Sequence, residues 1–315
     1  MERFVQDYGA DGLYVDGNCP LADFRLIEGD PRRGFRDRHG NVRPTYAVLA
    51  MRELTKRMRY VVDDRKGRPG FMLGHSSSTR FSPLLSFYDI LLIGENFYYW
   101  YQEPDERDAS PSGDYYYAHI FGAIDRLRAE FWWRPWGIPN LFLPELRGRD
   151  GKIVPNPTKG TRTLLAYLLH FDMLIWPNYS DVREIYKWWT IKDRFGMEDT
   201  AAESVEFVPY WENRLITAAN PSVKVSYYRK VAQPDPYVQT QDKVDILLIV
   251  SNLCFDDAEV GLSLSRELRD CTITDVDGQR RLDRSQPAAV RFKLAPYDFA
   301  ILRLVPGATT RGRTP

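Results

Sequence analysis

The chain has 315 residues, of which 43% are hydrophobic and 27% are charged, and its formal net charge is +0 at pH 7. This length allows a large core and a second, smaller domain. The balanced charge argues against nucleic acid or an anionic membrane as the main partner. Aromatic residues make up 14% of the chain, and their flat rings either fill a core or stack on the faces of sugars.

Cysteine and histidine usage limits the chemistry further. The three cysteines are too few and too scattered for a disulfide framework or a zinc site, and the four histidines are isolated from one another. We therefore expect no metal, and a metal-dependent hydrolase is a less favoured reading. No apolar run reaches the roughly 18 residues of a membrane span, and the N-terminus lacks a signal-peptide pattern. Cellular location stays open, with a secreted or periplasmic parent as one alternative.

The first element in chain order is a short buried strand at 12–15, and Asp16 follows it directly. In a parallel α/β barrel, catalytic side chains project from the C-terminal ends of the strands, so Asp16 is a candidate for chemistry. A polar loop at 18–43 comes next, longer than the two to six residues usual for such loops. Pro44 then opens an amphipathic helix that extends to about Tyr60.

Two more short apolar runs follow, at 71–74 and 90–93, and they are typical of strands buried on both faces. His75 follows the first run, and Gly94 and Glu95 follow the second. Two of the strands expected so far, 12–15 and 90–93, are thus followed by an acid, Asp16 and Glu95 respectively. An aromatic loop at 97–101 comes next, and the later segments continue the alternation of helix and strand. Helices are expected at 115–131, at 161–170 and from a cap at Asp181 to about Arg194. Strands are expected at 139–143, followed by Glu145 and Arg147, and at 173–176.

From about Glu203 the pattern changes to β-rich runs without helical periodicity. The pattern predicts an antiparallel domain, most simply a β-sandwich, over 201–306, with a disordered tail at 307–315. Asp277-Gly278 is expected to form a hairpin-type turn. The expected strands are 205–208, 215–218, 223–228, 245–251, 260–264, 272–275, 290–294 and 299–305.

Residues 1–200 predict an α/β fold, either a barrel or a doubly wound sheet. The glycines match neither a dinucleotide fingerprint nor a phosphate-binding loop, so we expect no nucleotide cofactor. Five strands are expected where a barrel needs eight. We therefore interpret the region as about strands 4 to 8 of an incomplete (β/α)8 barrel, with the first part encoded upstream.

The motifs at the strand ends resemble those of known enzymes. They are DGLYVDG at 11–17, GHSS at 74–77, IGE at 93–95 and YDFAILRL at 297–304. Together, over roughly 7–305, they resemble the C-terminal part of retaining glycoside hydrolases. The group that they resemble most is an uncharacterised one related to glycoside hydrolase family 123, and the similarity to the α-amylase and α-galactosidase superfamilies is looser. Family 123 enzymes use an adjacent Asp-Glu pair for substrate-assisted hydrolysis, and no such pair ends a strand here.

The resemblance implies an enzyme that hydrolyses O-glycosidic bonds of oligo- or polysaccharides with two carboxyl groups. By this resemblance Asp16 is the nucleophile and Glu95 the acid/base. In the alternative reading, Asp16 caps a turn and Glu95 pairs with Arg80 or Arg147. The fragment is expected to turn over poorly or not at all by itself.

Further residues are candidates for sugar binding. His75 either hydrogen-bonds a sugar hydroxyl or holds Glu95. Glu145 and Arg147 are a second acidic contact and its ion-pair partner, or else structural. The aromatic candidates stack on sugars or pack in the core: Tyr14, Tyr98, Tyr99, Trp100 and Trp176. A non-catalytic carbohydrate-binding or scaffold protein on a degenerate barrel is the alternative function, and the sequence predicts no oligomeric state.

Overall fold

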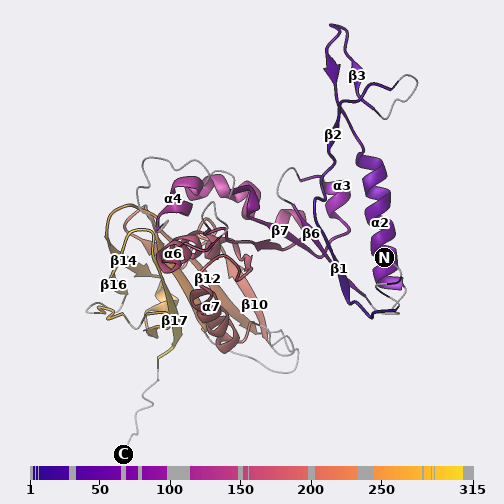
Figure 1. Cartoon of the computed structure of the whole chain (residues 1–315). Helices are drawn as coiled ribbons and strands as arrows, with labels where there is room; N and C mark the ends of the chain where they lie inside the picture. Colours follow the sequence, from indigo (N-terminus) through magenta and orange to yellow (C-terminus); the bar gives the residue numbers. More distant parts are fainter. Residues whose placement is uncertain are drawn as a thin grey trace, which may run out of the picture. The chain divides into compact units, whose positions relative to one another are not determined.

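The computed structural model describes residues 3, 5, 7–27, 33–64, 69–76, 80–97, 114–147, 152–154, 156–197, 203–232, 244–278, 280–284, 286 and 288–307 (Figure 1). The chain divides into two compact units. Unit 1 consists of Met1–Tyr98 and Trp133–Leu143, and unit 2 of Tyr99–Trp132 and Pro144–Pro315. The predicted domain boundary at residue 200 stays a prediction, and the predicted disordered tail from 308 onward lies outside the described residues.

A parallel sheet forms the centre of unit 1. The strands of this sheet that belong to unit 1 are β1 (Gly12–Val15), β6 (Phe71–His75), β7 (Ile90–Ile93) and β8 (Asn140–Phe142), in that order. In register, Val15 lies opposite Gly74, and His75 lies opposite Leu92. The neighbouring pairs β1–β6, β6–β7 and β7–β8 are all parallel, so the C-terminal ends of these strands share one edge.

The apolar runs expected at 71–74 and 90–93 are buried strands, as β6 and β7 show. The expectation of a buried first strand was wrong, because the residues of β1 are half-buried or exposed. Among the described strands, β1 lies at the end of the sheet order and pairs with β6 alone. One neighbour covers an edge strand less completely than two cover a central one, which leaves Tyr14 exposed.

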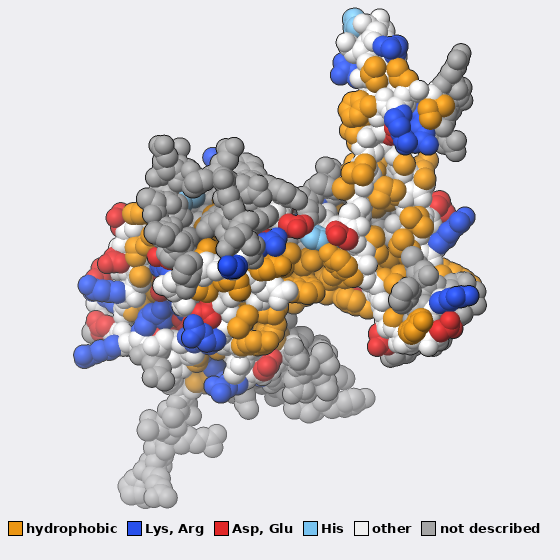
Figure 2. Space-filling view, viewed as in Figure 1, with side chains coloured by type: hydrophobic (Ala, Val, Ile, Leu, Met, Phe, Trp, Pro, Cys, Tyr) orange, Lys and Arg blue, Asp and Glu red, His pale blue; other side chains and the backbone are white. Residues whose placement is uncertain are grey.

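The predicted loop at 18–43 is largely paired. It forms two short antiparallel ribbons, one of β2 (Ala22–Asp23) with β5 (Thr45–Tyr46) and one of β3 (Phe35–Arg36) with β4 (Val42–Arg43). Helix α2 (Val48–Asp64) follows, and both its ends lie about one turn later than predicted. Figure 2 shows hydrophobic side chains gathered over the ribbons and α2. The exposed large hydrophobic residues of the 18–64 segment are Leu21, Phe24, Leu26, Ile27, Phe35, Val42, Tyr46, Leu49, Leu54 and Tyr60.

Unit 1 also contains two short helices before its last two strands. They are α3 (Ser82–Leu85), between β6 and β7, and the 3-10 helix η3 (Arg134–Trp136), before β8. The buried side chains of α3 are Leu84 and Leu85.

The helix predicted at 115–131 in unit 2 is broken into three pieces. They are α4 (Tyr116–Phe121), the 3-10 helix η2 (Ile124–Leu127) and α5 (Arg128–Phe131). The chain breaks at Gly122, whose φ of 56° lies in the left-handed region, and at the extended Ala123. Glycine adopts this φ without a steric penalty, so apolar spacing alone did not extend the helix.

The remaining helices of unit 2 follow the predictions. Helix α6 (Pro157–Leu168) starts four residues earlier than expected and continues into the 3-10 helix η4 (Leu169–Phe171), and β9 (Leu174–Ile175) follows. Helix α7 (Val182–Phe195) begins at its predicted cap, since the Asp181 carboxylate accepts a hydrogen bond from the Arg183 backbone N–H at 3.1 Å. Its buried face consists of Ile185, Trp188, Ile191 and Phe195. No described helix is long and apolar enough to cross a membrane.

All eight β runs predicted after residue 203 are strands. One antiparallel sheet has the order β10-β12-β13-β17-β15 and another the order β11-β14-β16, and both contribute to one hydrophobic cluster. In the described part of the chain, the 3-10 helix η5 (Arg266–Leu268) is the only helix after residue 203. The strands are β10 (Glu203–Val208), β11 (Ile216–Ala218), β12 (Val223–Ala232), β13 (Ile246–Asn252), β14 (Ala258–Leu264), β15 (Cys271–Asp275), β16 (Ala289–Leu294) and β17 (Phe299–Pro306).

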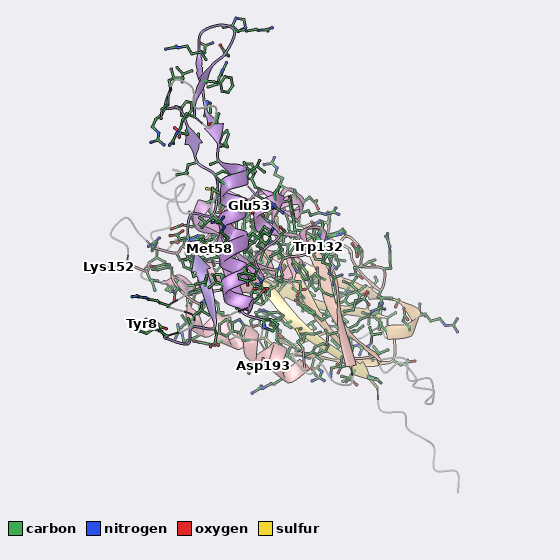
Figure 3. All side chains as sticks on the ribbon, turned by 90° about the vertical axis from the view of Figure 1, so that its right-hand side faces the viewer. Tyr8, Glu53, Met58, Trp132, Lys152 and Asp193 are labelled. Atoms are coloured by element: carbon green, nitrogen blue, oxygen red, sulfur yellow. The ribbon has the colours of Figure 1, made fainter. Side chains whose placement is uncertain are left out.

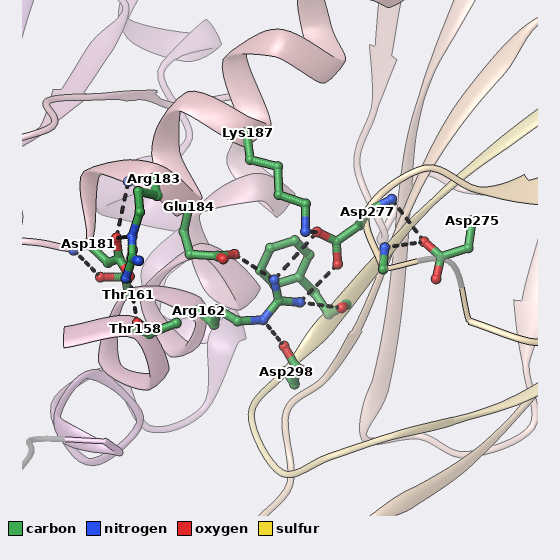
Figure 4. Close-up of polar contacts among 12 residues, drawn as sticks. Thr158, Thr161, Arg162, Asp181, Arg183, Glu184, Lys187, Asp275, Asp277 and Asp298 are labelled. Carbon is green, nitrogen blue, oxygen red and sulfur yellow. Dashed lines mark hydrogen bonds and ion pairs between the residues drawn. The ribbon is translucent and has the colours of Figure 1, made fainter. Parts of the chain in front are cut away.

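The predicted hairpin at Asp277-Gly278 was wrong. Strand β15 pairs with β17 and β16 pairs with β14, so the strands on either side of this turn lie in different sheets. The Asp275 carboxylate instead accepts the backbone N–H groups of Asp277 and Gly278, each at 2.9 Å. This turn directs the Asp277 side chain to Arg162 of α6 (Figure 4).

Arg162 joins α6 and α7 to the antiparallel region within unit 2 (Figure 4). Its guanidinium donates to Asp298 at 2.7 Å, to Glu184 at 2.7 Å, to Asp277 at 2.9 Å and to the Phe299 carbonyl at 3.0 Å. Lys187 of α7 also pairs with Asp277, at 2.7 Å. A charge removed from water needs this degree of pairing, and here the pairing ties two helices to the sheets.

Candidate functional site

His75, the last residue of β6, is the centre of a polar cluster in unit 1. Its Nδ1 lies 3.3 Å from the Asp16 Oδ1 and 2.6 Å from the Tyr14 hydroxyl oxygen. On the other side of the ring, its Nε2 lies 3.3 Å from the Glu95 Oε2. The imidazole therefore contacts two carboxylates, one at each nitrogen.

Strand order accounts for this meeting. Asp16 follows the last residue of β1, and Glu95 comes two residues after the end of β7, while β6 lies between these strands. Gly94 permits the turn after β7, because its φ is 121° and a Cβ there would lie 2.4 Å from the Leu143 carbonyl oxygen. Any other residue would push the chain away from Leu143 and displace Glu95.

The two carboxylates have different surroundings. The Asp16 side chain is 76% exposed and the Glu95 side chain 30% exposed, whereas the imidazole between them is 6% exposed. Water screens a charge on Asp16 more than one on Glu95. Two acidic groups in unlike environments are what acid/base chemistry needs, since one must hold a proton while the other stays ionised.

Tyr14 supplies a third polar contact to His75. Burial raises the pKa of the Tyr14 phenol, and the nearby charges of Asp16 and Glu95 raise it further. The phenol therefore stays protonated near neutral pH and is able to donate a hydrogen bond to His75 Nδ1. When Nδ1 accepts this hydrogen bond, the neutral ring carries its proton on Nε2, and the Nε2–H faces Glu95. In the imidazolium form both nitrogens carry a proton, and each N–H faces one carboxylate.

Two other properties of the site follow from its residues. Among the described residues, no group of three or more His, Cys, Asp and Glu side chains has the arrangement of a metal site.

Asn18, to which the sequence analysis assigned no role, is buried beside Gly74 of β6. Burial raises the pKa of Tyr88, while its hydrogen bonds with Thr55 and Asn18 act to lower it. Asn18 comes directly after Gly17, and this position at the end of the first strand was the one sequence signal that pointed to it.

Glu145 and Arg147 form an ion pair in unit 2. Glu145 is 0% exposed, and Arg147 donates to both of its carboxylate oxygens, from Nη2 at 3.2 Å and also from Nε. The Arg147 guanidinium lies 4.3 Å from the centre of the Tyr179 ring, and the Glu145 backbone N–H donates to the Tyr117 hydroxyl oxygen at 2.6 Å. The pair is thus built into the packing of unit 2, as the structural alternative expected. A sugar contact for these residues stays a prediction.

The remaining predicted site residues are aromatic. Trp176 is half-buried after β9. Tyr14 is exposed and belongs to the His75 cluster. Tyr98, Tyr99 and Trp100 lie outside the described residues.

No family model and no curated protein sequence matches this chain. Solved structures similar to it include a maltogenic α-amylase from Thermotoga neapolitana, with 12% identity and a TM-score of 0.46 over 97% of this chain and 64% of that one. A GH27 β-L-arabinopyranosidase from Geobacillus stearothermophilus has 13% identity and a TM-score of 0.47, over 99% of this chain and 61% of that one. A trehalose-6-phosphate hydrolase from Bacillus licheniformis has 11% identity and a TM-score of 0.44, over 97% of this chain and 67% of that one.

This chain spans less than two thirds of the length of the α-amylase and the arabinopyranosidase. All three similar structures are glycoside hydrolases by their names. The resemblance to family 123 stays a prediction.

Proposed function

We propose that this chain carries the catalytic carboxylates of a glycoside hydrolase that acts on O-glycosidic bonds of oligo- or polysaccharides. The observation that carries the proposal is the meeting of Asp16 and Glu95 on opposite sides of His75, at the shared C-terminal edge of three neighbouring strands. Glycoside hydrolysis requires two carboxyl groups near one scissile bond. Parallel α/β enzymes place such groups at this edge.

The surroundings suggest a role for each group. Glu95, the more sheltered carboxyl, is the acid that gives its proton to the leaving oxygen and later takes one from water. Asp16, the more exposed, is the ionised group that attacks or stabilises the sugar carbon as the bond breaks. His75 is a positioning residue, because each ring nitrogen faces one carboxylate and in the imidazolium form each ring N–H can donate to one. Carboxyl groups about 5 Å apart favour retention at the sugar carbon and about 6.5–9.5 Å favour inversion.

The wider architecture that we propose is an incomplete (β/α)8 barrel followed by a β-sandwich. The parallel sheet with an edge strand at β1 supports the first part. The two antiparallel sheets that share one hydrophobic cluster support the second. A larger parent protein would then supply further rim residues, and this chain alone would hydrolyse sugars poorly. His75 and Tyr14 are proposed to line the sugar site of unit 1, and sugar contacts by Tyr98, Trp100 and Trp176 stay predictions from the sequence.

The test measures hydrolysis of a panel of aryl glycosides and oligosaccharides by the chain, by its natural parent and by variants of each. Glu95→Gln and Asp16→Asn keep side-chain size and remove the carboxylate, and each should cost about 10²–10⁴-fold in rate. The matched controls are Glu53→Gln on α2 and Asp193→Asn on α7, exposed carboxylates outside the His75 cluster (Figure 3). An active parent that tolerates both site substitutions would refute the assignment.

A non-catalytic carbohydrate-binding role is the second candidate. The observation in its favour is the 76% exposure of the Asp16 side chain, since an open carboxylate is well solvated and suits hydrogen bonding to sugar hydroxyls. A parent that binds oligosaccharides of the panel and hydrolyses none of them would support this role. Measurable turnover that is lost in Glu95→Gln would reject it.

A further inference from the structure

Three aromatic rings meet within unit 2. Tyr115 lies 5.2 Å from Phe255 and 5.7 Å from Tyr297 between ring centres, and Phe255 lies 6.3 Å from Tyr297. We call these three residues the aromatic triad. Phe255 is 59% exposed, whereas Tyr115 and Tyr297 are half-buried. Exposure of so large an apolar ring costs free energy in water, and contact with a ligand would recover it.

The loops that carry the triad are firmly held. The buried side chain of Asn252 donates to the carbonyls of Asp256 at 2.8 Å and Ala295 at 3.0 Å, which ties the two loops together. The Tyr297 backbone N–H donates to the Cys254 carbonyl at 3.2 Å. Tyr297 also has a φ of 47°, a left-handed conformation that costs free energy in a bulky residue. The rings are therefore presented by a preorganised backbone, which lowers the entropic cost of binding.

Charged groups of both signs surround the rings. The Lys159 ammonium lies 5.6 Å from the centre of the Tyr115 ring and donates to the Pro296 carbonyl at 2.6 Å. Burial lowers the pKa of Lys159 and the Arg162 guanidinium lowers it further, whereas the carboxylates of Asp298, Asp114 and Asp257 raise it. The triad thus has one ammonium beside it, and an aspartate adjoins each of its rings in the sequence: Asp114, Asp256 and Asp298.

This combination discriminates between ligand classes. A cationic ligand on the ring faces would meet the Lys159 ammonium, and an anionic one would meet the carboxylates and the electron-rich ring faces. A wholly apolar ligand would remove charged groups from water without replacing their hydrogen bonds. A neutral sugar avoids each penalty, because its C–H face stacks on a ring while its hydroxyls donate to carboxylates and accept from an ammonium.

We propose that Tyr115, Phe255 and Tyr297, with Lys159 at their border, bind one residue of a neutral oligo- or polysaccharide. This site consists of residues other than Asp16 and Glu95, and its binding does not depend on hydrolysis. It adds a sugar-holding role to unit 2 that is separate from the proposed chemistry of unit 1.

The experiment is affinity electrophoresis of the whole chain through native gels that contain soluble starch, arabinoxylan, galactomannan or mixed-linkage β-glucan. At least one polysaccharide should slow migration, and Phe255→Ala should weaken that retardation about tenfold. Phe255→Trp, which keeps an aromatic face, should preserve it. Tyr186→Ala removes a comparably exposed ring from α7 of the same unit and should change nothing. Because Phe255 is exposed, its replacement is expected to leave the fold intact, and circular dichroism checks this.

Several outcomes would overturn the proposal. They are the absence of retardation by all four polysaccharides, equal retardation of the wild type and Phe255→Ala, and retardation only by a polyanion such as heparin or by immobilised choline. The Asp16→Asn/Glu95→Gln double variant separates this proposal from the catalytic one. It should bind polysaccharide as the wild type does, whatever its activity on aryl glycosides.

Discussion

Unit 1 and unit 2 each gather charged side chains around one basic residue, and the two clusters differ in solvation. His75 in unit 1 contacts a carboxylate at each nitrogen, and one of these carboxylates is largely open to water. Arg162 in unit 2 donates to three carboxylates and a carbonyl, and its partner Asp277 is 2% exposed. The first cluster is accessible to a ligand, whereas the second is enclosed by the protein.

The difference separates a site that suits chemistry from one that supports the fold. Arginine stays charged at every working pH, and its five N–H donors match several fixed acceptors. Histidine changes charge near neutral pH and serves proton transfer. Both clusters contain aspartate and glutamate, so the presence of acids in the sequence did not show which cluster suits chemistry and which supports the fold. Enclosure by α6, α7 and the antiparallel sheets makes the Arg162 cluster structural.

The largest effect on stability is expected from Arg162→Ala. This substitution leaves Asp277 buried without its main partner, and breaking such a pair costs about 3–5 kcal/mol in the free energy of unfolding. Urea unfolding followed by circular dichroism measures the change. Lys293→Ala, which removes one member of the exposed pair Lys293–Glu259, is the control and should leave the midpoint unchanged. Equal midpoints for Arg162→Ala and the wild type would contradict the structural role.

His170 sharpens the comparison of buried and accessible groups. It is fully buried in unit 2, its Nδ1 lies 2.7 Å from the Ser226 hydroxyl, and burial together with the charge of Lys224 lowers its pKa to about 3. The unfolded chain, with a histidine pKa of about 6.5, binds the proton more readily. Its contribution to stability is therefore complete above that pH and decreases by about 1.4 kcal/mol per pH unit as the pH falls toward 3.

Urea unfolding at several pH values tests this dependence. In His170→Gln the same side-chain position no longer titrates, so the difference in unfolding free energy between wild type and variant should change between pH 6.5 and pH 4.5. A difference that is constant over this range would show that His170 does not couple folding to protonation.

His75→Asn is expected to affect activity more than stability. Loss of the imidazole frees both carboxylates from their common contact, and misplacement of catalytic groups costs up to about a hundredfold in rate. The pH profile of kcat for glycoside hydrolysis should shift in the variant, which a purely structural residue would not cause. Tyr14→Phe keeps the ring and removes the hydroxyl, and it should have a smaller effect. An unchanged pH profile in His75→Asn would count against a positioning role.

The smallest of these effects concerns the cap of α7. Asp181→Ala removes the acceptor for the Arg183 backbone N–H and should lower the free energy of unfolding by about 1 kcal/mol. Asp181→Asn keeps a capping oxygen and should cost less. Thermal unfolding measures both, and an equal loss in the two variants would mean that the ion pair with Arg183, and not the cap, stabilises this helix end.

Local patterns account for the parts that could be predicted. The eight strands after residue 203 and the α7 helix with its cap depend on side-chain alternation, helical spacing and one acceptor at the first turn. The candidate pair Asp16 and Glu95 was found in the same way, because an acid after a short apolar run marks a strand end. These signals lie within a few neighbouring residues and need no knowledge of the rest of the chain.

Contacts between distant segments account for the parts that could not. The pairing of the 18–43 segment, the break at Gly122 and the role of Asp277 depend on backbone geometry and on which strands become neighbours. Likewise, the placement of β6 between β1 and β7 brought His75 between two carboxylates that are 79 positions apart in the sequence.

By itself, the sequence of this protein determined which segments become strands or helices and where acids follow them, since these depend on local periodicity and on the chemistry of single residues. Tertiary structure alone decided which acids are enclosed and which stay open to water. Asp277 and Asp16 are the same residue type, yet Asp277 is enclosed beside Arg162, Lys187 and Arg280, while Asp16 lies at the open edge of a sheet. Burial and pairing arise from neighbours supplied by distant parts of the chain, and a linear pattern of residues does not contain them.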